Sequence, residues 1–242
     1  MATVPTGSDT DVTAPQALLF DVFGTVVDWR TSIAAQVSSA LPELDDPYGF
    51  ADRWRSLYQP SMEEVRSGAR DFTRLDDLHL ESLRTVLSEF DIQLSDGAVA
   101  DLNRSWHRLD AWPDSVEGIT RLKTRFVVAP LSNGNISLLL DMAKNASIPW
   151  DAILGAEPVR AYKPMPDAYL RTADILGLRP DECMMVAAHN SDLEAARDCG
   201  FRTAFVRRPS EHGPGQTSDL DASSDWTHSV ESITELASTL NC

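Results

Sequence analysis

Short apolar segments alternate with longer amphipathic segments through the second half of this 242-residue chain. The short segments have the composition of buried strands: residues 126–131, 152–155, 184–188 and 203–206. The segments between them are of helical length, and in residues 136–145 and 166–176 apolar side chains recur every three or four positions. Because strands that alternate with helices pair in parallel, the pattern predicts an α/β fold with a parallel sheet flanked by helices.

Residues 207–226 interrupt this alternation. The segment is rich in glycine, proline, serine and charged residues, a composition typical of loops, so we expect a surface loop there. A last helix is expected over residues 229–239.

Another strand-like run, ALLFD, occupies residues 17–21 and ends in the carboxylate Asp21. The turn residue Gly24 follows it closely. In open α/β sheets, ligands bind beyond the carboxyl ends of the strands, so Asp21 is placed for chemistry.

Residues 31–112 differ in character from the rest of the chain. They show helical periodicity and little strand pattern, as in the leucine spacing of residues 75–90, and predict a helical insertion. The expected organisation is therefore a core made of residues 17–30 and 113–242, which carries a helical cap at 31–112. Residues 1–16 are mostly small and polar or acidic, and we expect them to form a flexible tail.

The charge and the cysteine content narrow the function classes. A net charge of −16 argues against binding to nucleic acid or to an anionic membrane surface, because both are negatively charged. No segment approaches the roughly 20 apolar residues of a membrane-spanning helix, and the N-terminus lacks the basic and apolar regions of a signal peptide. The three widely spaced cysteines predict neither a disulfide framework nor a zinc site. These features favour the reducing cytoplasm as the location.

Polar residues cluster in four groups where the predicted strands end. The groups are Asp21 with Thr25, Ser132 with Asn133, Lys163 with Tyr169, and His189 with Asn190 and Asp192. Taken singly, each group has a structural explanation, since Thr25 or Ser132 can cap a helix and Asp192 suits a helix N-terminus. Their order and spacing along the chain nevertheless favour one shared site at the carboxyl edge of the sheet.

The motifs that contain these residues are DVFGT, SNG, KP with Tyr169 six residues after Lys163, and HNSD. In this order they resemble the haloacid dehalogenase superfamily, and the resemblance covers nearly the whole chain. It implies a Rossmann-like core with a helical cap inserted after the first motif, in agreement with the predicted organisation. Because the superfamily includes phosphatases, phosphonatases and dehalogenases, the motifs alone leave the reaction open.

Phe23, the second residue after Asp21, separates these activities. A phosphatase of the superfamily carries a second aspartate there, because the departing alkoxide needs a general acid and the magnesium site needs carboxylates. Phe23 neither donates a proton nor holds charge, whereas a halide leaves as a stable anion. The last motif, HNSD, keeps one carboxylate, Asp192, where metal-binding relatives offer two. We therefore expect carbon–halogen cleavage, with Phe23 in contact with the substrate and with no metal and no cofactor.

Further details resemble the type II (L-)2-haloacid dehalogenase branch of the superfamily. That branch supplies an arginine from the cap in a WR-x-x-Q-like stretch, and here Trp54 and Arg55 lie in WRSLYQ. Arg55 is expected to bind the substrate carboxylate or the leaving halide, because a guanidinium offers several fixed donors and stays charged. The alternatives are a surface position for Arg55, or the same role for Arg53, Arg66 or Arg70.

The resemblance implies a mechanism through an aspartyl ester. Asp21 displaces halide at C2 of a small halogenated carboxylic acid, and water then attacks the carboxyl carbon of Asp21. The product is a 2-hydroxy acid of inverted configuration. Lys163 keeps Asp21 ionised, and Thr25 and Ser132 orient the carboxylates by hydrogen bonding. Tyr169 supports Lys163 or the aspartate of the last motif.

The other motif residues contact the halide or the water. Asn133, with Arg55, solvates the departing halide. Asp192, together with His189 or Asn190, positions and activates the hydrolytic water.

The last motif departs from the pattern of the branch. Where well-known relatives have Ser-Ser-Asn, this chain has Ala187, Ala188 and His189. The change removes a hydroxyl donor near the nucleophile and adds an imidazole whose ordinary pKa is near neutrality. His189 is therefore either a base or halide contact, or a packed structural residue, and the exact substrate depends on which it is.

Two other functions stay open. The first is a phosphatase or phosphonatase-like hydrolase of the same fold. Phosphonatases also lack the second aspartate but use a cap lysine, and residues 31–112 contain no lysine. The second is a non-catalytic binding module, against which the intact motif residues count. The sequence leaves open the preferred halogen, cleavage of fluoroacetate, chain length, stereochemistry and oligomeric state, for which relatives suggest a homodimer through the cap.

Overall fold

The structure, a computed structural model, describes residues 14–242. Most of the predicted tail, residues 1–16, therefore lies outside the described residues. Within residues 14–242, no helix is both long and apolar enough to cross a membrane.

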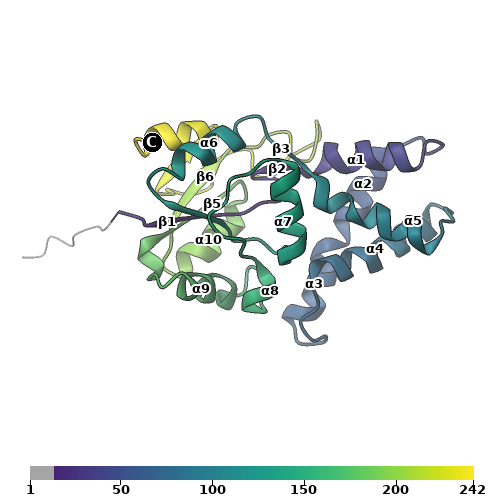
Figure 1. The fold of residues 1–242 in the computed structure, drawn as a ribbon, viewed down its shortest axis with the longest axis horizontal. Helices are drawn as coiled ribbons and strands as arrows, with labels where there is room; N and C mark the ends of the chain where they lie inside the picture. The colour runs from purple at the N-terminus through teal and green to yellow at the C-terminus, as the bar shows by residue number, and fades with distance from the viewer. Residues whose placement is uncertain (1–13) are drawn as a thin grey trace, which may run out of the picture.

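A five-stranded parallel sheet forms the centre of the fold (Figure 1). Its strands, in spatial order, are β4 (Val127–Pro130), β1 (Ala17–Phe20), β5 (Cys183–Ala187), β6 (Arg202–Val206) and β7 (His228–Val230). β1 pairs with β4 on one side and with β5 on the other, and every residue of it is fully buried. The predicted α/β fold with a parallel sheet is confirmed, and Asp21 follows β1, an interior strand of this sheet.

Helices cover both faces of the sheet because strand side chains alternate between the faces. Leu18 and Phe20 of β1 pack in a cluster that contains side chains of α6 (Ser115–Leu122), α7 (Ile136–Asn145) and α11 (Ile233–Thr239). Leu19 packs in a second cluster, which contains side chains of three further helices: α8 (Ala156–Val159), α9 (Pro166–Ile175) and α10 (Asn190–Asp198). In Figure 1, α6 and α11 lie above the strands, and α8 and α9 lie below them.

Two predicted elements near the sheet were wrong. Residues 152–155 form no strand, because Gly155 approaches the loop after β4 so closely that a Cβ there would lie 2.3 Å from the Gly134 carbonyl oxygen. The last predicted helix began too early, since β7 precedes α11. β7 is a three-residue edge strand in which Val230 alone is buried, so it has too little apolar pattern to be recognised.

The segment between β1 and α6 is mainly helical. Its helices are α1 (Trp29–Ala40), α2 (Pro47–Ser56), α3 (Tyr58–Arg66), α4 (Leu75–Glu89), α5 (Asp96–Asn103) and the 3₁₀ helix η1 (Arg104–Arg108). Two short antiparallel strands, β2 (Val27–Asp28) and β3 (Asp110–Ala111), join this helical segment to the sheet. The side chain of Asp28 caps α1 by accepting from the backbone N–H of Thr31 at 3.0 Å.

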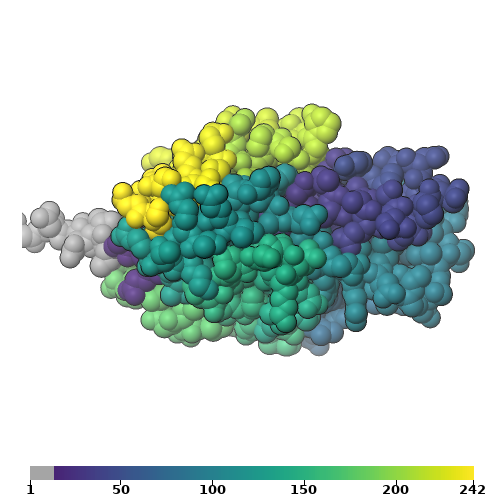
Figure 2. Space-filling view, turned by 45° about the horizontal axis from the view of Figure 1, so that its top comes forward, coloured from purple at the N-terminus to yellow at the C-terminus, as the bar shows by residue number. Residues whose placement is uncertain are grey.

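The helical segment packs directly on the sheet layer. One continuous apolar cluster contains Phe20 from the sheet together with Trp29, Trp54 and Trp106 from the helical segment. Figure 2 shows the same continuity at the surface, where the purple and blue helices adjoin the teal and green layer. The ends of the central strands are therefore covered by side chains of the helical segment, as an enclosed site requires. We keep residues 31–112 as the proposed cap.

Candidate active site

A cavity of about 620 Å³ lies where the central strands end beneath the helical segment. Most of the predicted site residues line it: Asp21, Phe23, Arg55, Asn133, Lys163, Tyr169, His189 and Asp192. The prediction that the strand ends converge on one place is therefore consistent with the geometry, because these residues come from five separate parts of the chain.

Asp21 is a buried carboxylate in the wall of this cavity, with 6% of its surface exposed. The Lys163 ammonium donates to its Oδ1 at 2.9 Å, and the Thr25 hydroxyl donates to its Oδ2 at 2.7 Å. The Thr25 hydroxyl in turn accepts from the backbone N–H of Ala188 at 2.9 Å, which fixes its direction. Burial alone would raise the pKa of Asp21, but Lys163 and His189 hold it well below its usual range. Asp21 is thus an ionised carboxylate held in one orientation.

Asp192 is the second carboxylate of the site and lies in the first turn of α10. Lys163 contacts it, and the Tyr169 hydroxyl donates to its Oδ1 at 2.6 Å. Burial raises the pKa of Asp192 above its ordinary value, and the charge of Asp21 adds to this, although Lys163 acts in the opposite direction. The pKa values of the two carboxylates are therefore shifted in opposite directions. Asp21 favours the ionised form, whereas Asp192 takes up a proton more readily.

Lys163 occupies the position between the two carboxylates. Burial would lower the pKa of Lys163, but Asp192 and Asp21 raise it, so the ammonium stays charged. A divalent cation bound to both carboxylates would have to displace this ammonium or share the space with it. Within residues 14–242, no group of three or more His, Cys, Asp and Glu side chains is arranged to hold a metal ion.

Arg55 supplies a second cation to the cavity from the last turn of α2. Its guanidinium lies over the ring of Tyr58, at 3.9 Å from the centroid, and near the rings of Trp29 and Phe23. The Nη1 atom is buried and has no hydrogen-bond partner among the described residues. A buried donor without a partner is costly, so this atom is suited to bind an anion that enters the cavity.

Phe23 forms an apolar part of the cavity wall. It is 2% exposed and packs edge-on against Tyr58 and Trp106, at 6.2 and 5.9 Å between ring centroids. These contacts fix the ring in place. An aspartate at this position would need polar partners, whereas the side chains around Phe23 are aromatic.

Asn133 and Ser132 differ in their positions relative to the cavity. Asn133 lines the cavity and uses its Oδ1 to accept from the backbone N–H of Lys163 at 2.7 Å. Ser132 is buried and accepts from the backbone N–H of Gly134 at 3.2 Å. No carboxylate contact of Ser132 is found among residues 14–242, so its predicted role in orienting the carboxylates is not supported.

Asn190 turns away from the cavity, contrary to the predicted contact with substrate or water. Its Nδ2 donates to the Asp219 carboxylate and the Asp221 carbonyl, at 2.8 and 3.0 Å. Its Oδ1 accepts from the Ser223 backbone and the Trp226 indole, at 2.9 and 3.0 Å. The reason is that residues 207–226 fold back over the start of α10, where Asn190 holds them.

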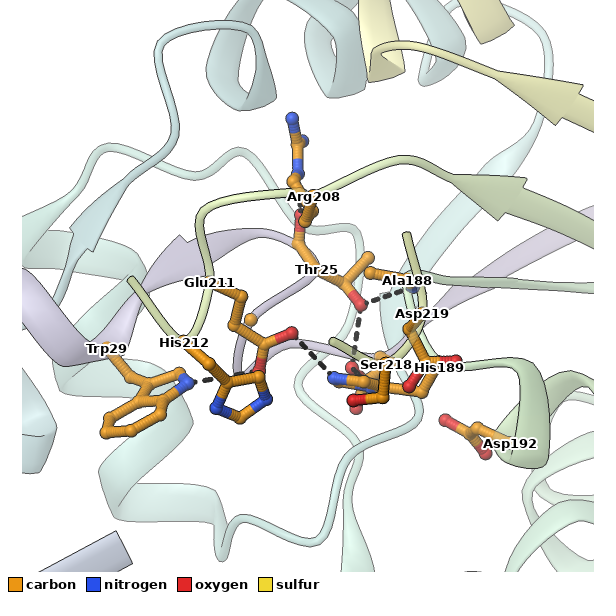
Figure 3. A network of polar contacts seen from close by, with 12 residues as sticks. Thr25, Trp29, Ala188, His189, Asp192, Arg208, Glu211, His212, Ser218 and Asp219 are labelled. Atoms are coloured by element: carbon orange, nitrogen blue, oxygen red, sulfur yellow. Dashed lines mark hydrogen bonds and ion pairs between the residues drawn. The ribbon is translucent and has the colours of Figure 1, made fainter. Parts of the chain in front are cut away.

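Glu211 is a buried acid of the site that the sequence pattern did not reveal. Residues 207–226 were predicted as a surface loop, yet Glu211 is 1% exposed and lines the cavity. His189 bridges it to Asp21. Its Nε2 lies 2.9 Å from Glu211 Oε2 (Figure 3), and its Nδ1 lies 3.1 Å from Asp21 Oδ2. The Trp29 indole donates to the other Glu211 oxygen at 3.0 Å. A single acid in a polar loop carries no periodic pattern, so only the folded chain identifies it.

Arg208 anchors this loop to the first motif. Its guanidinium forms a bidentate ion pair with Asp114, with both distances 2.9 Å, and its Nε donates to the Thr25 carbonyl at 2.9 Å. Gly24 makes room for the loop, since it has a φ of +88° and a Cβ there would lie 2.0 Å from Glu211 Oε1. The turn after Asp21 and the position of Glu211 therefore depend on each other.

Comparisons with known proteins relate most of the chain to one family. The sequence model of the haloacid dehalogenase-like hydrolase family matches residues 15–200. The crystal structure of a defluorinating L-2-haloacid dehalogenase superposes with a TM-score of 0.93 and 54% sequence identity, over 94% of this chain and 96% of that one. A second L-2-haloacid dehalogenase superposes with a TM-score of 0.91 and 43% identity, over 94% and 99% of the two chains. The (S)-2-haloacid dehalogenase 4A of Burkholderia cepacia is 28% identical over 227 residues, which are 91% of this chain and 93% of that protein.

Proposed function

The chain belongs to the haloacid dehalogenase-like hydrolase family, and on this premise we propose that it is an (S)-2-haloacid dehalogenase. The substrates are small 2-haloalkanoic acids, with the haloacetates and fluoroacetate among them, and the products are a 2-hydroxy acid and halide. The observation that carries the proposal is the ionised Asp21 beside the apolar Phe23, in a cavity where Arg55 has an unpartnered donor. This combination suits attack on an anionic substrate whose leaving group needs no proton.

The first step is displacement at C2. A lone pair of the Asp21 carboxylate forms a bond to C2, and the carbon–halogen bond breaks with its electron pair on the halide. Arg55 and Asn133 contact the substrate carboxylate or the halide, since both side chains line the cavity. The result is an ester of Asp21 with inverted configuration at C2.

The second step is hydrolysis of this ester. Asp192 takes a proton from water, which attacks the carboxyl carbon of Asp21. The raised pKa of Asp192 supports its assignment as the base, and Tyr169 and Lys163 hold it in place. Collapse of the adduct releases the 2-hydroxy acid and restores Asp21.

A phosphatase or phosphonatase of the same fold is the alternative. A phosphatase requires a proton donor near the leaving oxygen, and Phe23 supplies none. A phosphonatase requires a free lysine to form a Schiff base, whereas Lys163 is engaged by two carboxylates. The residues of the cavity therefore favour dehalogenation.

Halide release distinguishes these activities. The purified protein is incubated with chloroacetate, fluoroacetate and each enantiomer of 2-chloropropionate in the presence of EDTA, and halide is measured by ion chromatography. A phosphate ester with and without magnesium is tested in parallel. We expect halide release that survives EDTA, with preference for the S enantiomer. Magnesium-dependent phosphate release without halide release would contradict the proposal.

Arg55→Lys tests the anion-binding role of the guanidinium. We expect the KM for chloroacetate to rise about 10- to 100-fold with a smaller change in kcat, because an ammonium has fewer fixed donors. Arg53→Lys is the matched control, since Arg53 lies on the same helix and pairs with the exposed Glu89 at 2.7 Å. If both substitutions raised the KM equally, the effect would come from a change in the helix and not from lost binding of the anion by Arg55.

A further inference from the structure

We propose that His189, held in its charged form by Glu211, is a catalytic residue of ester hydrolysis that donates from Nδ1 to the oxyanion formed at Asp21 Oδ2. The inference rests on the proposed function, because it concerns the Asp21 ester. It assigns Glu211 as a positioning residue that touches His189 and not the ester.

The two oxygens of Asp21 have different partners. Oδ1 accepts from the Lys163 ammonium, whereas Oδ2 accepts from the Thr25 hydroxyl and lies 3.1 Å from His189 Nδ1. Oδ2 thus has a hydroxyl donor and a close imidazole nitrogen, whereas Oδ1 has the ammonium and keeps a free lone pair. Oδ1 is therefore the attacking oxygen, and Oδ2 becomes the carbonyl oxygen of the ester.

This assignment fixes where negative charge develops during hydrolysis. Water attacks the carboxyl carbon of Asp21 and gives a proton to Asp192, while the carbonyl electron pair moves onto Oδ2. The adduct then expels the alkoxide of the product, which takes the proton from Asp192. The Asp21 carboxyl loses its own proton to solvent. At Oδ2, the Thr25 hydroxyl already donates and His189 Nδ1 lies 3.1 Å away, so both groups are close enough to form an oxyanion hole.

Glu211 explains why His189 stays charged after Asp21 has become a neutral ester. Burial alone would lower the pKa of His189, but Glu211 and Asp21 raise it well above its ordinary value. The contribution of Asp21 is lost in the ester, whereas Glu211 remains ionised. Burial would raise the pKa of Glu211, but His189 lowers it, with smaller contributions from His212 and Arg55.

The surroundings of Glu211 hold it in place for this role. The Trp29 indole fixes one of its oxygens, and Arg208 ties its loop to the turn that follows Asp21. Other charged groups line the same cavity as His189: Lys163 and Asp192, Arg55, and Asp219, whose Oδ1 accepts from the backbone N–H of Asn190 next to His189. A protonated imidazole cannot accept a proton from water, so Asp192 and not His189 is the base.

His189→Ala tests the role of the donor. With saturating (S)-2-chloropropionate, we expect the variant to release about one equivalent of chloride at close to the wild-type rate and then to turn over about 10²–10³-fold more slowly. Intact-protein mass spectrometry should show the ester accumulating on Asp21 in the variant only. Equal slowing of the burst and of turnover, with no ester, would overturn the inference. If the wild-type protein releases no halide, the proposed function itself has failed.

Glu211→Gln separates a charged donor from a base. Without the Glu211 charge, burial lowers the pKa of His189 in the ester form, so hydrolysis should fall as pH rises through the lowered value. We expect near wild-type rates near pH 5 and a loss of about 10- to 100-fold near pH 8. If the rate of the variant relative to the wild-type protein rises with pH, the neutral form of His189 is the active one, and the inference is overturned. Glu231→Gln is the control, because Glu231 is an exposed glutamate in an ion pair with Arg207.

Discussion

Asp21→Asn is expected to lower halide release by about 10⁴-fold or more, because a neutral amide is a poor nucleophile at carbon. The substitution keeps the size of the side chain and its contact with Thr25, so the fold should be retained. Chloride release from chloroacetate, measured by ion chromatography, provides the test. The peptide that contains residue 21 is analysed by mass spectrometry in the same preparation, since deamidation of the asparagine would restore the wild-type residue.

Isotope labelling identifies the covalent role of Asp21 independently. In a single turnover in water enriched in oxygen-18, the label should enter the Asp21 carboxylate, because water attacks the carboxyl carbon and not C2. Label found first in the 2-hydroxy acid would mean direct displacement by water and would exclude the ester. Asp21→Ala is a second variant that cannot regain a nucleophile by deamidation, and it should be as inactive as Asp21→Asn.

Lys163→Met is expected to have the second largest effect, on both activity and stability. The ammonium contacts two buried carboxylates, so its removal leaves Asp192 without this cation and leaves Asp21 with the Thr25 hydroxyl and His189. Breaking a buried ion pair on one side costs about 3–5 kcal/mol of stability, which corresponds to a fall of about 10 °C in the melting temperature for a chain of this length. Halide release should fall about 10³-fold, since Asp21 loses the donor that aligns Oδ1.

The pH dependence of this destabilisation has a defined sign. In the wild-type protein, the lowered pKa of Asp21 contributes stability above its unfolded value and loses it as pH falls through the folded value. In Lys163→Met, burial raises the pKa of Asp192 further, so the folded state takes up a proton more readily than the unfolded state. The melting temperature of the variant should therefore rise as pH falls from 8 to 5, approaching that of the wild-type protein. A pH-independent deficit would indicate lost packing in place of unpaired charge. Arg53→Met, at an exposed ion pair, is the control.

The site residues at the strand ends were predictable because an apolar strand and a polar residue shortly after it occur together there. The buried strand ALLF is apolar at every position, and Asp21 directly follows it. The same holds at β5, which precedes His189 and Asp192. In a parallel sheet these ends meet at one edge, so their polar residues had to lie close together once the strands were identified.

Errors arose where the pattern was short or where tertiary contacts overrode it. Residues 152–155 have an apolar composition, but Gly155 packs against the Gly134 backbone and no pairing follows. β7 has three residues at a sheet edge and was read as part of a helix. Asn190 belongs to a motif, yet the returning loop engages its amide completely.

The sequence by itself determined the parallel α/β core and the residues that follow its strands, with Asp21, the proposed nucleophile, among them, since hydrophobic periodicity and chain order specify which groups share an edge. The sequence also shows that the apolar Phe23 stands at the position where a phosphatase of the superfamily needs a general acid. Only the tertiary structure brought Glu211 to His189, because a loop of polar residues has no periodicity that would predict where it folds back. Two close contacts fix the position of Glu211: the ion pair of Arg208 with Asp114, and the close approach of Glu211 to the backbone that Gly24 permits. Such contacts join residues that are far apart in the sequence, and they form only when the folded sheet brings those residues together.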